Sequence, residues 1–189
     1  GGYSLKGTEN ILGMKYDKAG GVSVLATLIT AARLKLPQPL VGIIPTAENM
    51  ISGGSYRPDD ILTSMSGKTI EIVSTDAEGR LILADALTYT QRTFKPAALI
   101  DMATLTGGVI VALGHARAGI LSNDEALCKA LIAAGESTYE RLWQLPLDEE
   151  YNDLIKSHEA DMKNSGGREA STIMGGIFLK QFIEEDTRW

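Results

Sequence analysis

TIEIVSTDAEGRLILADALTYTQR, residues 69–92, is the stretch on which the fold prediction rests. Its first part, 69–73, is rich in β-branched residues and lies between Gly67 and Asp76, which predicts a strand. Over residues 80–92 the apolar side chains return at helical spacing, which predicts a helix. The stretch therefore predicts a strand, a short acidic connection and a helix in direct succession.

The same alternation continues on both sides of this stretch. Further strands are predicted at 40–45, 97–102 and 118–121, and further helices at 19–36, 105–113, 124–141 and 172–184. Strands that alternate with helices predict an α/β fold, here a layered mixed sheet, largely parallel and flanked by helices. Residues 48–66 are rich in Gly, Ser, Pro and Asp and are predicted to form one long loop, which in a compact domain is usually functional.

The composition is globular and excludes several classes of protein. The chain has 189 residues, of which 44% are hydrophobic and 22% charged, which excludes disorder. Its net charge of -6 and lack of a basic run make nucleic acid an unexpected partner. No apolar run approaches the roughly 20 residues that span a bilayer. A single cysteine, Cys128, excludes an internal disulfide, and two histidines are too few for a His/Cys zinc cluster.

Asp76 and Glu78 are the first candidates for chemistry. They are two positions apart, so in an extended segment both carboxylates point to one side, where they repel each other unless a cation lies between them. Hard divalent ions prefer such oxygen ligands, and α/β sheets bind ligands at this end of their strands. The same spacing also fits a helix N-cap with acids in the first turn, which the helix dipole favours. From these residues alone, both interpretations stay open.

Other candidates are ambiguous when taken singly. Asp17 precedes the helix predicted from residue 19 and is by itself more typical of a cap than of a metal ligand. Lys6 follows a glycine-rich opening and by default is a solvated surface lysine. Gly-Lys-Thr at 67–69 imitates the end of a phosphate-binding loop, but Leu62 stands where that motif needs glycine and a strand follows it, so nucleotide binding is not expected.

A series of motifs resembles one family, the leucyl or cytosol aminopeptidases of peptidase family M17. TDAEGR at 75–80 is similar to its N-T-D-A-E-G-R signature. Further matches follow in order: GGYSLK at 1–6, MKYD at 14–17, ENM at 48–50, YRPDD at 56–60, ATLTG at 103–107, WQLPL at 143–147 and ADM at 160–162. Because the similarity covers essentially the whole chain, it favours the metal interpretation of Asp76 and Glu78 over the helix cap.

The resemblance implies a role for each matching residue. Asp17, Asp76 and Glu78 correspond to carboxylate ligands of a two-metal centre, with Glu78 bridging the ions. Lys6 corresponds to a catalytic lysine that steadies the substrate carbonyl, and Arg80 to an arginine that holds bicarbonate. The substrate pocket would be lined by Met14, Thr104, Leu105 and Gly107, together with Lys6.

The resemblance also implies an activity, cofactors and partners. The expected reaction removes the N-terminal residue, preferably leucine-like, from peptide substrates by means of a metal-activated water. Two divalent ions are expected, Mn²⁺ or Zn²⁺ first and Mg²⁺ or Co²⁺ as alternatives, with bicarbonate as a further candidate. The implied protein is cytoplasmic, has no membrane partner and forms a homohexamer at full length. Residues 1–189 would be a partial catalytic domain, incomplete at both ends and without the family's N-terminal domain.

Two departures from the family pattern affect these expectations. Ser74 stands where the family usually has asparagine. The metal-binding lysine and first bridging aspartate of the family precede its S-G-G stretch and are not among these residues. The present residues alone are therefore expected to hold metal weakly and to show little or no activity.

Two other functions are the alternatives to an aminopeptidase. One is another co-catalytic metallohydrolase that acts on a phosphate or an amide, and the whole motif series argues against it. The other is a non-catalytic relative that serves as a scaffold or binds DNA. Retention of the five site residues argues against that inactive form: Lys6, Asp17, Asp76, Glu78 and Arg80.

Overall fold

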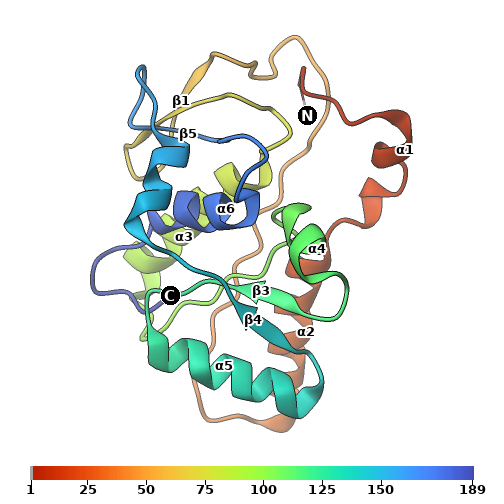
Figure 1. Ribbon diagram of the computed structural model, residues 1–189. Coiled ribbons are helices and arrows are strands. Elements are labelled where there is room, and N and C mark those ends of the chain that lie inside the picture. The colour runs from red at the N-terminus through yellow and green to blue at the C-terminus, as the bar shows by residue number, and fades with distance from the viewer. Residues whose placement is uncertain (1) are drawn as a thin grey trace.

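The computed structural model describes residues 2–189 and has the α/β architecture that the alternating pattern predicts (Figure 1). The predicted succession of strand, acidic connection and helix is present as β2 and α3. The elements in chain order are α1 (Thr8–Ile11), η1 (Met14–Tyr16), α2 (Ala19–Leu34), β1 (Ile61–Thr63), β2 (Thr69–Glu71), α3 (Gly79–Phe94), α4 (Gly108–Leu113), β3 (Ala118–Ile120), α5 (Glu125–Thr138), β4 (Leu142–Gln144), η2 (Glu149–Ile155), β5 (Met162–Lys163) and α6 (Ser171–Lys180).

The strands form two small sheets in the described part of the chain, and most of their pairings are parallel. In the first sheet β2 lies between β1 and β5, antiparallel to β1 and parallel to β5, with Ile70 opposite Leu62 and Met162. In the second sheet β3 and β4 pair in parallel, with Gly119 opposite Trp143. The predicted preference for parallel pairing is confirmed, whereas the single layered sheet is not.

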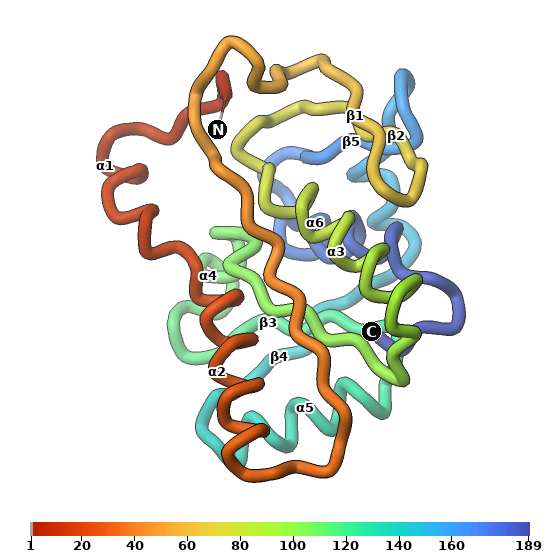
Figure 2. Tube along the Cα trace, turned by 180° about the vertical axis from the view of Figure 1, so that it is seen from behind, coloured from red at the N-terminus to blue at the C-terminus, as the bar shows by residue number. Residues whose placement is uncertain are grey.

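Two predicted strands, 40–45 and 97–102, are wrong. Neither segment joins a ladder among the described residues, and the second one bends at residues 97–98. An apolar run becomes a strand only where its amide and carbonyl groups meet a neighbouring backbone in register. Residues 40–45 run beside α2 instead (Figure 2), so close that a Cβ on Gly42 would lie 2.5 Å from Leu28 Cδ1. In the other segment, the Leu99 amide donates to the Arg188 carbonyl at 2.8 Å.

The long loop predicted at 48–66 is wrong at its end, because β1 lies within it. A tight turn after β1 returns the chain as β2: the Ser64 amide donates to the Lys68 carbonyl at 2.9 Å, and Gly67 takes a positive φ of 94°. Helix positions are predicted well, but their ends differ. The helix predicted from residue 105 begins at Gly108, and that predicted to reach 184 ends at Lys180.

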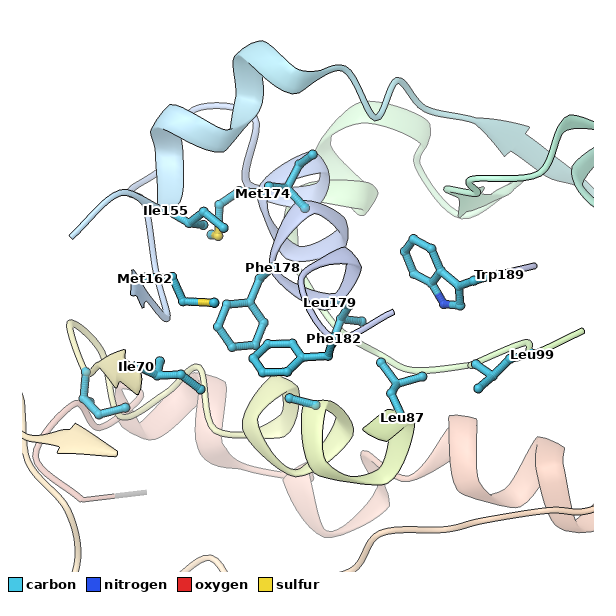
Figure 3. Packing of buried hydrophobic residues seen from close by; sticks show 13 residues of the cluster. Ile70, Leu87, Leu99, Ile155, Met162, Met174, Phe178, Leu179, Phe182 and Trp189 are labelled. Carbon is cyan, nitrogen blue, oxygen red and sulfur yellow. The ribbon is translucent and has the colours of Figure 1, made fainter. Parts of the chain in front are cut away.

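Helix α6 is the centre of the hydrophobic core (Figure 3). Residues 174–179 are all buried, as expected for a helix that is apolar on every side. Phe178 and Phe182 place their rings 5.3 Å apart, and Leu87 of α3 and Ile70 of β2 belong to the same cluster. The core thus joins α6 to the strand and helix that flank the acidic connection.

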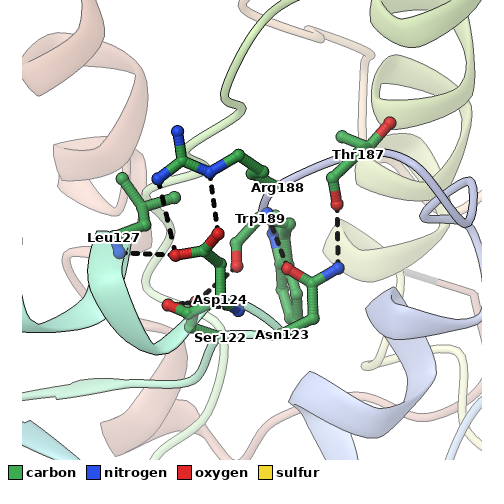
Figure 4. Close-up of polar contacts among 7 residues, drawn as sticks. All are labelled: Ser122, Asn123, Asp124, Leu127, Thr187, Arg188 and Trp189. Atoms are coloured by element: carbon green, nitrogen blue, oxygen red, sulfur yellow. Dashed lines mark hydrogen bonds and ion pairs between the residues drawn. The ribbon is translucent and has the colours of Figure 1, made fainter.

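The C-terminal segment is tied to the start of α5 by polar contacts (Figure 4). Asp124 caps α5 by accepting from the Leu127 amide at 2.6 Å, and it pairs with Arg188 Nε at 2.7 Å. These two contacts lower the pKa of Asp124, the arginine contributing most. Asn123 donates to the Thr187 carbonyl at 2.8 Å. Among the described residues, no helix has the length and apolar character needed to cross a membrane.

Candidate functional site

The acidic loop, residues 74–78, connects β2 to α3 and carries both predicted carboxylate ligands. Glu78 occupies the N-cap position of α3, yet its side chain makes no capping hydrogen bond. Asp76 has a 41% exposed side chain and forms an ion pair with Lys6. The helix-cap interpretation of Glu78 is therefore not supported by the geometry.

Two polar side chains from distant parts of the sequence contact these carboxylates. Lys6 donates to Asp76 Oδ1 across 70 positions, so a predicted catalytic residue meets a predicted ligand. Asn49 Nδ2 donates to Glu78 Oε1 at 3.1 Å. Asn49 was not singled out from the sequence as a site residue, although it lies in the ENM motif that carries part of the resemblance.

The N-terminal segment that carries Lys6 is fastened to the acidic loop by a reciprocal pair of hydrogen bonds. The Ser4 amide donates to Thr75 Oγ1 at 2.8 Å, and the Thr75 amide donates to Ser4 Oγ at 3.0 Å. Gly2 allows this approach, since a Cβ there would lie 2.9 Å from the Tyr56 carbonyl oxygen. The hydrogen bonds between Ser4 and Thr75 therefore help to position Lys6, in addition to the ion pair that Lys6 makes itself.

Tyr56 lies at the same site, where burial and the negative charge of Glu78 affect its pKa. Burial, reinforced by that negative charge, raises the pKa of Tyr56 to about 12. A cavity of about 330 Å³ opens between Gly2, Asn49 and Tyr56. One residue that lines this cavity, Asn49, is also the hydrogen-bond donor to Glu78 of the acidic loop.

Arg80, the predicted bicarbonate ligand, is only 6% exposed. Its Nη1 donates to the Asn164 carbonyl and to Met174 Sδ, both at 2.9 Å, and its Cζ lies 5.9 Å from the Phe178 ring centroid. Burial lowers its pKa, while the charge of Glu78 acts in the opposite direction. Its Nε is buried and has no hydrogen-bond partner within residues 2–189.

The third predicted ligand, Asp17, does not join the acidic loop. It is exposed at the end of η1, and residues 2–189 contain no group of three or more His, Cys, Asp or Glu side chains arranged to hold a metal ion. Met14, a predicted pocket residue, is 40% exposed on the same segment. The structure thus pairs Lys6 with Asp76 on the loop that bears Glu78, and among the described residues Asp17 does not complete a three-residue acidic group with them.

The remaining predicted pocket residues precede or begin α4. Thr104 and Gly107 are exposed, whereas Leu105 packs against α6, where a Cβ on Gly175 would lie 3.0 Å from Leu105 Cδ2. A Cβ on Gly20 would lie 2.0 Å from the Met102 carbonyl oxygen. The start of α2, just after Asp17, therefore lies beside the segment that leads to Thr104.

The residues present fit a divalent-ion site in part. Asp76 and Glu78 supply hard oxygen donors from one loop, and an ammonium group already neutralises one of them. A closed site needs further ligands, which these residues do not bring to the loop.

A comparison with models of protein families assigns the whole chain to one family. The model of the cytosol aminopeptidase family, catalytic domain, matches residues 1–189. The chain belongs to the cytosol aminopeptidase family. The family suggested by the sequence motifs is thereby confirmed.

Similar proteins agree with this assignment. A probable cytosol aminopeptidase of Geobacter sulfurreducens is 54% identical over 189 residues, which cover 100% of this chain and 38% of the relative. One of Hydrogenovibrio crunogenus is 52% identical over 185 residues, 98% of this chain and 38% of the relative. The solved leucyl aminopeptidase of Trypanosoma brucei, in complex with actinonin, is 35% identical with a TM-score of 0.91, over 98% of this chain and 37% of that one. The present chain thus spans well under half the length of the proteins it matches.

Proposed function

We propose that this chain forms part of the active site of an aminopeptidase that removes the N-terminal residue, leucine-like by preference, from peptides. The observation that carries the proposal is the meeting of Lys6 with Asp76 on the loop that also bears Glu78. The Lys6 ammonium, paired with one of two carboxylates on this loop, would place a positive charge at the edge of the proposed cation site. The names of the matching relatives support the same reaction.

Asp17, Asp76 and Glu78 are the residues proposed to hold two divalent ions, of which Mn²⁺ and Zn²⁺ suit the site first, then Mg²⁺ and Co²⁺. When bound, such ions supply Lewis-acid polarisation and a water of lowered pKa. Asp17 would have to approach the acidic loop, and its neighbour α2 already lies against the segment leading to Thr104. Asn49 would orient the Glu78 carboxylate through its hydrogen bond.

Lys6 is proposed to stabilise the negative charge that develops on the substrate carbonyl oxygen. Its side chain is 34% exposed, and its long stem lets the ammonium turn from Asp76 toward a bound peptide. A single donor aimed at such an oxyanion contributes about 2.7–4 kcal/mol to transition-state stabilisation. The reciprocal bonds of Ser4 with Thr75 hold the start of this stem in place.

Arg80 is proposed to hold bicarbonate, which would act as the general base. The buried Nε supports this role, because a donor without a protein partner is costly unless an acceptor fills its place. An oxygen of a small planar anion suits a guanidinium edge. Nη1 is already engaged by the Asn164 carbonyl, so the anion would meet the remaining edge.

Met14, Thr104, Leu105 and Gly107 are proposed to border the substrate side chain. Leu105 is the best supported of them, because its packing against Gly175 fixes it near Met174, which contacts Arg80. As implied by the family resemblance, we further propose that residues 1–189 are a partial catalytic domain of a cytoplasmic protein that assembles as a homohexamer at full length.

The test is hydrolysis of leucine p-nitroanilide by this chain and by a version extended to the length of the relatives, with and without Mn²⁺. Metal-dependent release of p-nitroaniline by the extended version, with about two ions bound, is the expected result. Metal-independent or absent hydrolysis would overturn the proposal.

Added bicarbonate should raise the rate of the unsubstituted enzyme and have little effect on Arg80→Ala. An equal response in both proteins would remove bicarbonate from the proposal.

A further inference from the structure

Asn164 follows β5 and is fully buried, at 0% exposure. Its side-chain oxygen accepts from the amides of Val73 at 2.9 Å and Ser74 at 3.2 Å. Its side-chain nitrogen donates to the carbonyls of Ser74 at 2.7 Å and Ala77 at 3.4 Å. An asparagine has two donor hydrogens and an oxygen with two lone pairs, so this amide is fully used on one short stretch of backbone.

The main chain of Asn164 makes two further hydrogen bonds, one to β2 and one to α3. Its amide donates to the Glu71 carbonyl at 2.9 Å, next to the parallel pairing of β2 with β5. Its carbonyl accepts from Arg80 Nη1 at 2.9 Å. One buried residue therefore links the end of a strand, the acidic loop and the arginine at the start of α3.

The loop depends on such a partner because it lies between elements. Val73 and Ser74 follow β2 and precede α3, so neither a sheet ladder nor a helix satisfies their amides. Buried backbone groups need hydrogen-bond partners, and a side chain must supply them where secondary structure does not. Asn164 supplies these partners. Its hydrogen bonds to residues 73–74 and to residue 77 lie on either side of Asp76 in the sequence.

We propose that Asn164 is the positioning residue of the site, which sets the backbone path of the acidic loop and holds Arg80 beside it. Its contacts with the loop stand independently of any activity, whereas their catalytic consequence rests on the proposed function. Residues that orient metal ligands from outside typically change metal affinity or activity by 10–100-fold when substituted. Asn164→Ala in the holoenzyme is therefore expected to weaken Mn²⁺ binding and lower kcat by about that factor.

A buried amide with a purely structural role provides the matched control. Gln91 on α3 is 3% exposed, donates to the carbonyls of Leu87 and Phe182, and accepts from the Glu184 amide at 2.7 Å. None of these partners belongs to the acidic loop. Gln91→Ala should destabilise the fold to an extent similar to Asn164→Ala while leaving Mn²⁺ affinity and kcat near those of the unsubstituted enzyme.

The test combines hydrogen exchange, metal titration and kinetics. In metal-free unsubstituted protein, the Val73 and Ser74 amides should be protected although they lie outside helices and strands. Asn164→Ala should expose them selectively, and Asn164→Asp, which keeps the accepting oxygen, should retain more of the protection. Mn²⁺ titration and leucine p-nitroanilide kinetics should then show weaker metal binding and a lower kcat, with KM for the peptide analogue little changed.

The outcomes separate this inference from the proposed function. Fast exchange of both amides in the unsubstituted protein would overturn the positioning role, whether or not any variant folds. Unchanged kcat and metal affinity in a folded Asn164→Ala enzyme would do the same. Absence of metal-dependent hydrolysis in the unsubstituted enzyme would instead remove the proposed function and leave the exchange result standing.

Discussion

Helices α2 and α3 are both 16 residues long, and each follows carboxylates predicted to bind metal, Asp17 before α2 and Asp76 with Glu78 before α3. They differ in what surrounds them. Helix α2 has one buried residue, Ala31. Helix α3 has five: Arg80, Ala84, Leu87, Thr88 and Gln91.

The difference is the reverse of what their compositions suggest. Helix α2 is mainly apolar, yet Val22 is 61% exposed and Leu25 is 50% exposed. Helix α3 buries an arginine, a threonine and a glutamine because α6 and its flanking segments supply acceptors and packing. The burial of α3 therefore comes from the elements that pack against it, whereas the exposure of α2 is that of residues 2–189 alone, in a chain that spans 38% of a matching relative.

The carboxylates before the two helices differ in the same way. Asp76 and Glu78 have partners from three distant segments, through Lys6, Asn49 and the contacts of Asn164 with their loop. Asp17 is exposed at the end of a short 3-10 helix. Loops become ordered sites where tertiary contacts satisfy their backbone, and the region before α3 meets that condition.

Substituting these carboxylates tests the comparison most strongly. Glu78→Gln in the holoenzyme is expected to lower kcat/KM about 10³-fold, about 4 kcal/mol, because a neutral ligand leaves bound cations poorly neutralised. Asp17→Asn is expected to have an effect of the same order, since the family resemblance assigns it to the same centre. The measurements are leucine p-nitroanilide kinetics and metal content, with Glu9→Gln on exposed α1 as the control. Full metal content in Asp17→Asn would confine the ligands to the α3 side.

Core substitutions compare the packing of the two regions directly. Phe178→Ala removes a fully buried ring from α6 beside α3 and is expected to lower the free energy of unfolding by about 3–5 kcal/mol. Leu25→Ala on α2, where the side chain is half exposed, should cost less than about 1 kcal/mol. Urea unfolding of the purified protein measures both values. Equal losses would contradict the observed difference in burial.

Lys6→Met tests whether the charge beside Asp76 acts in catalysis. The substitution keeps the length of the stem and removes the ammonium, so kcat should fall about 10²-fold, about 2.7 kcal/mol, while metal content stays near normal. Lys129→Met on the surface of α5 is the control, because within residues 2–189 the ion pair of that lysine is with Glu125 on its own helix. Joint loss of metal and rate in Lys6→Met would make the lysine part of the metal site instead.

The smallest expected effect is the pH dependence contributed by Tyr56. Its pKa is about 12 in the folded protein against an ordinary value of 10.0, mainly because of burial. Between these pH values the unfolded chain releases the phenol proton while the folded chain retains it, so stability should fall as pH rises. Urea unfolding at pH 9, 10 and 11 should show a steeper decline in the unsubstituted protein than in Tyr56→Phe. Equal slopes would exclude a perturbed Tyr56.

Local patterns predicted the unit around the acidic loop well. The β-branched run at 69–73 and the helical spacing after Arg80 both depend on neighbours in sequence, and β2 and α3 lie there. The motif series identified the family, whereas the roles of Lys6 and Asp76 remain a prediction. Asn49 lies within the quoted ENM motif but was given no role, and Asn164 was not singled out, because an isolated asparagine has no periodicity or spacing that marks it.

The amino-acid sequence by itself determined the alternating elements, the family and the types of chemical group available, since these follow from side-chain order along the chain. Only the tertiary structure decided that 40–45 and 97–102 join no ladder and that α3 buries five residues while apolar α2 buries one. It also decided that Asn164 hydrogen-bonds the backbone of the acidic loop. The physical reason is that hydrogen-bond satisfaction and burial depend on partners many positions away. Residue 164 lies 90 positions from Ser74, a separation that no local pattern can record.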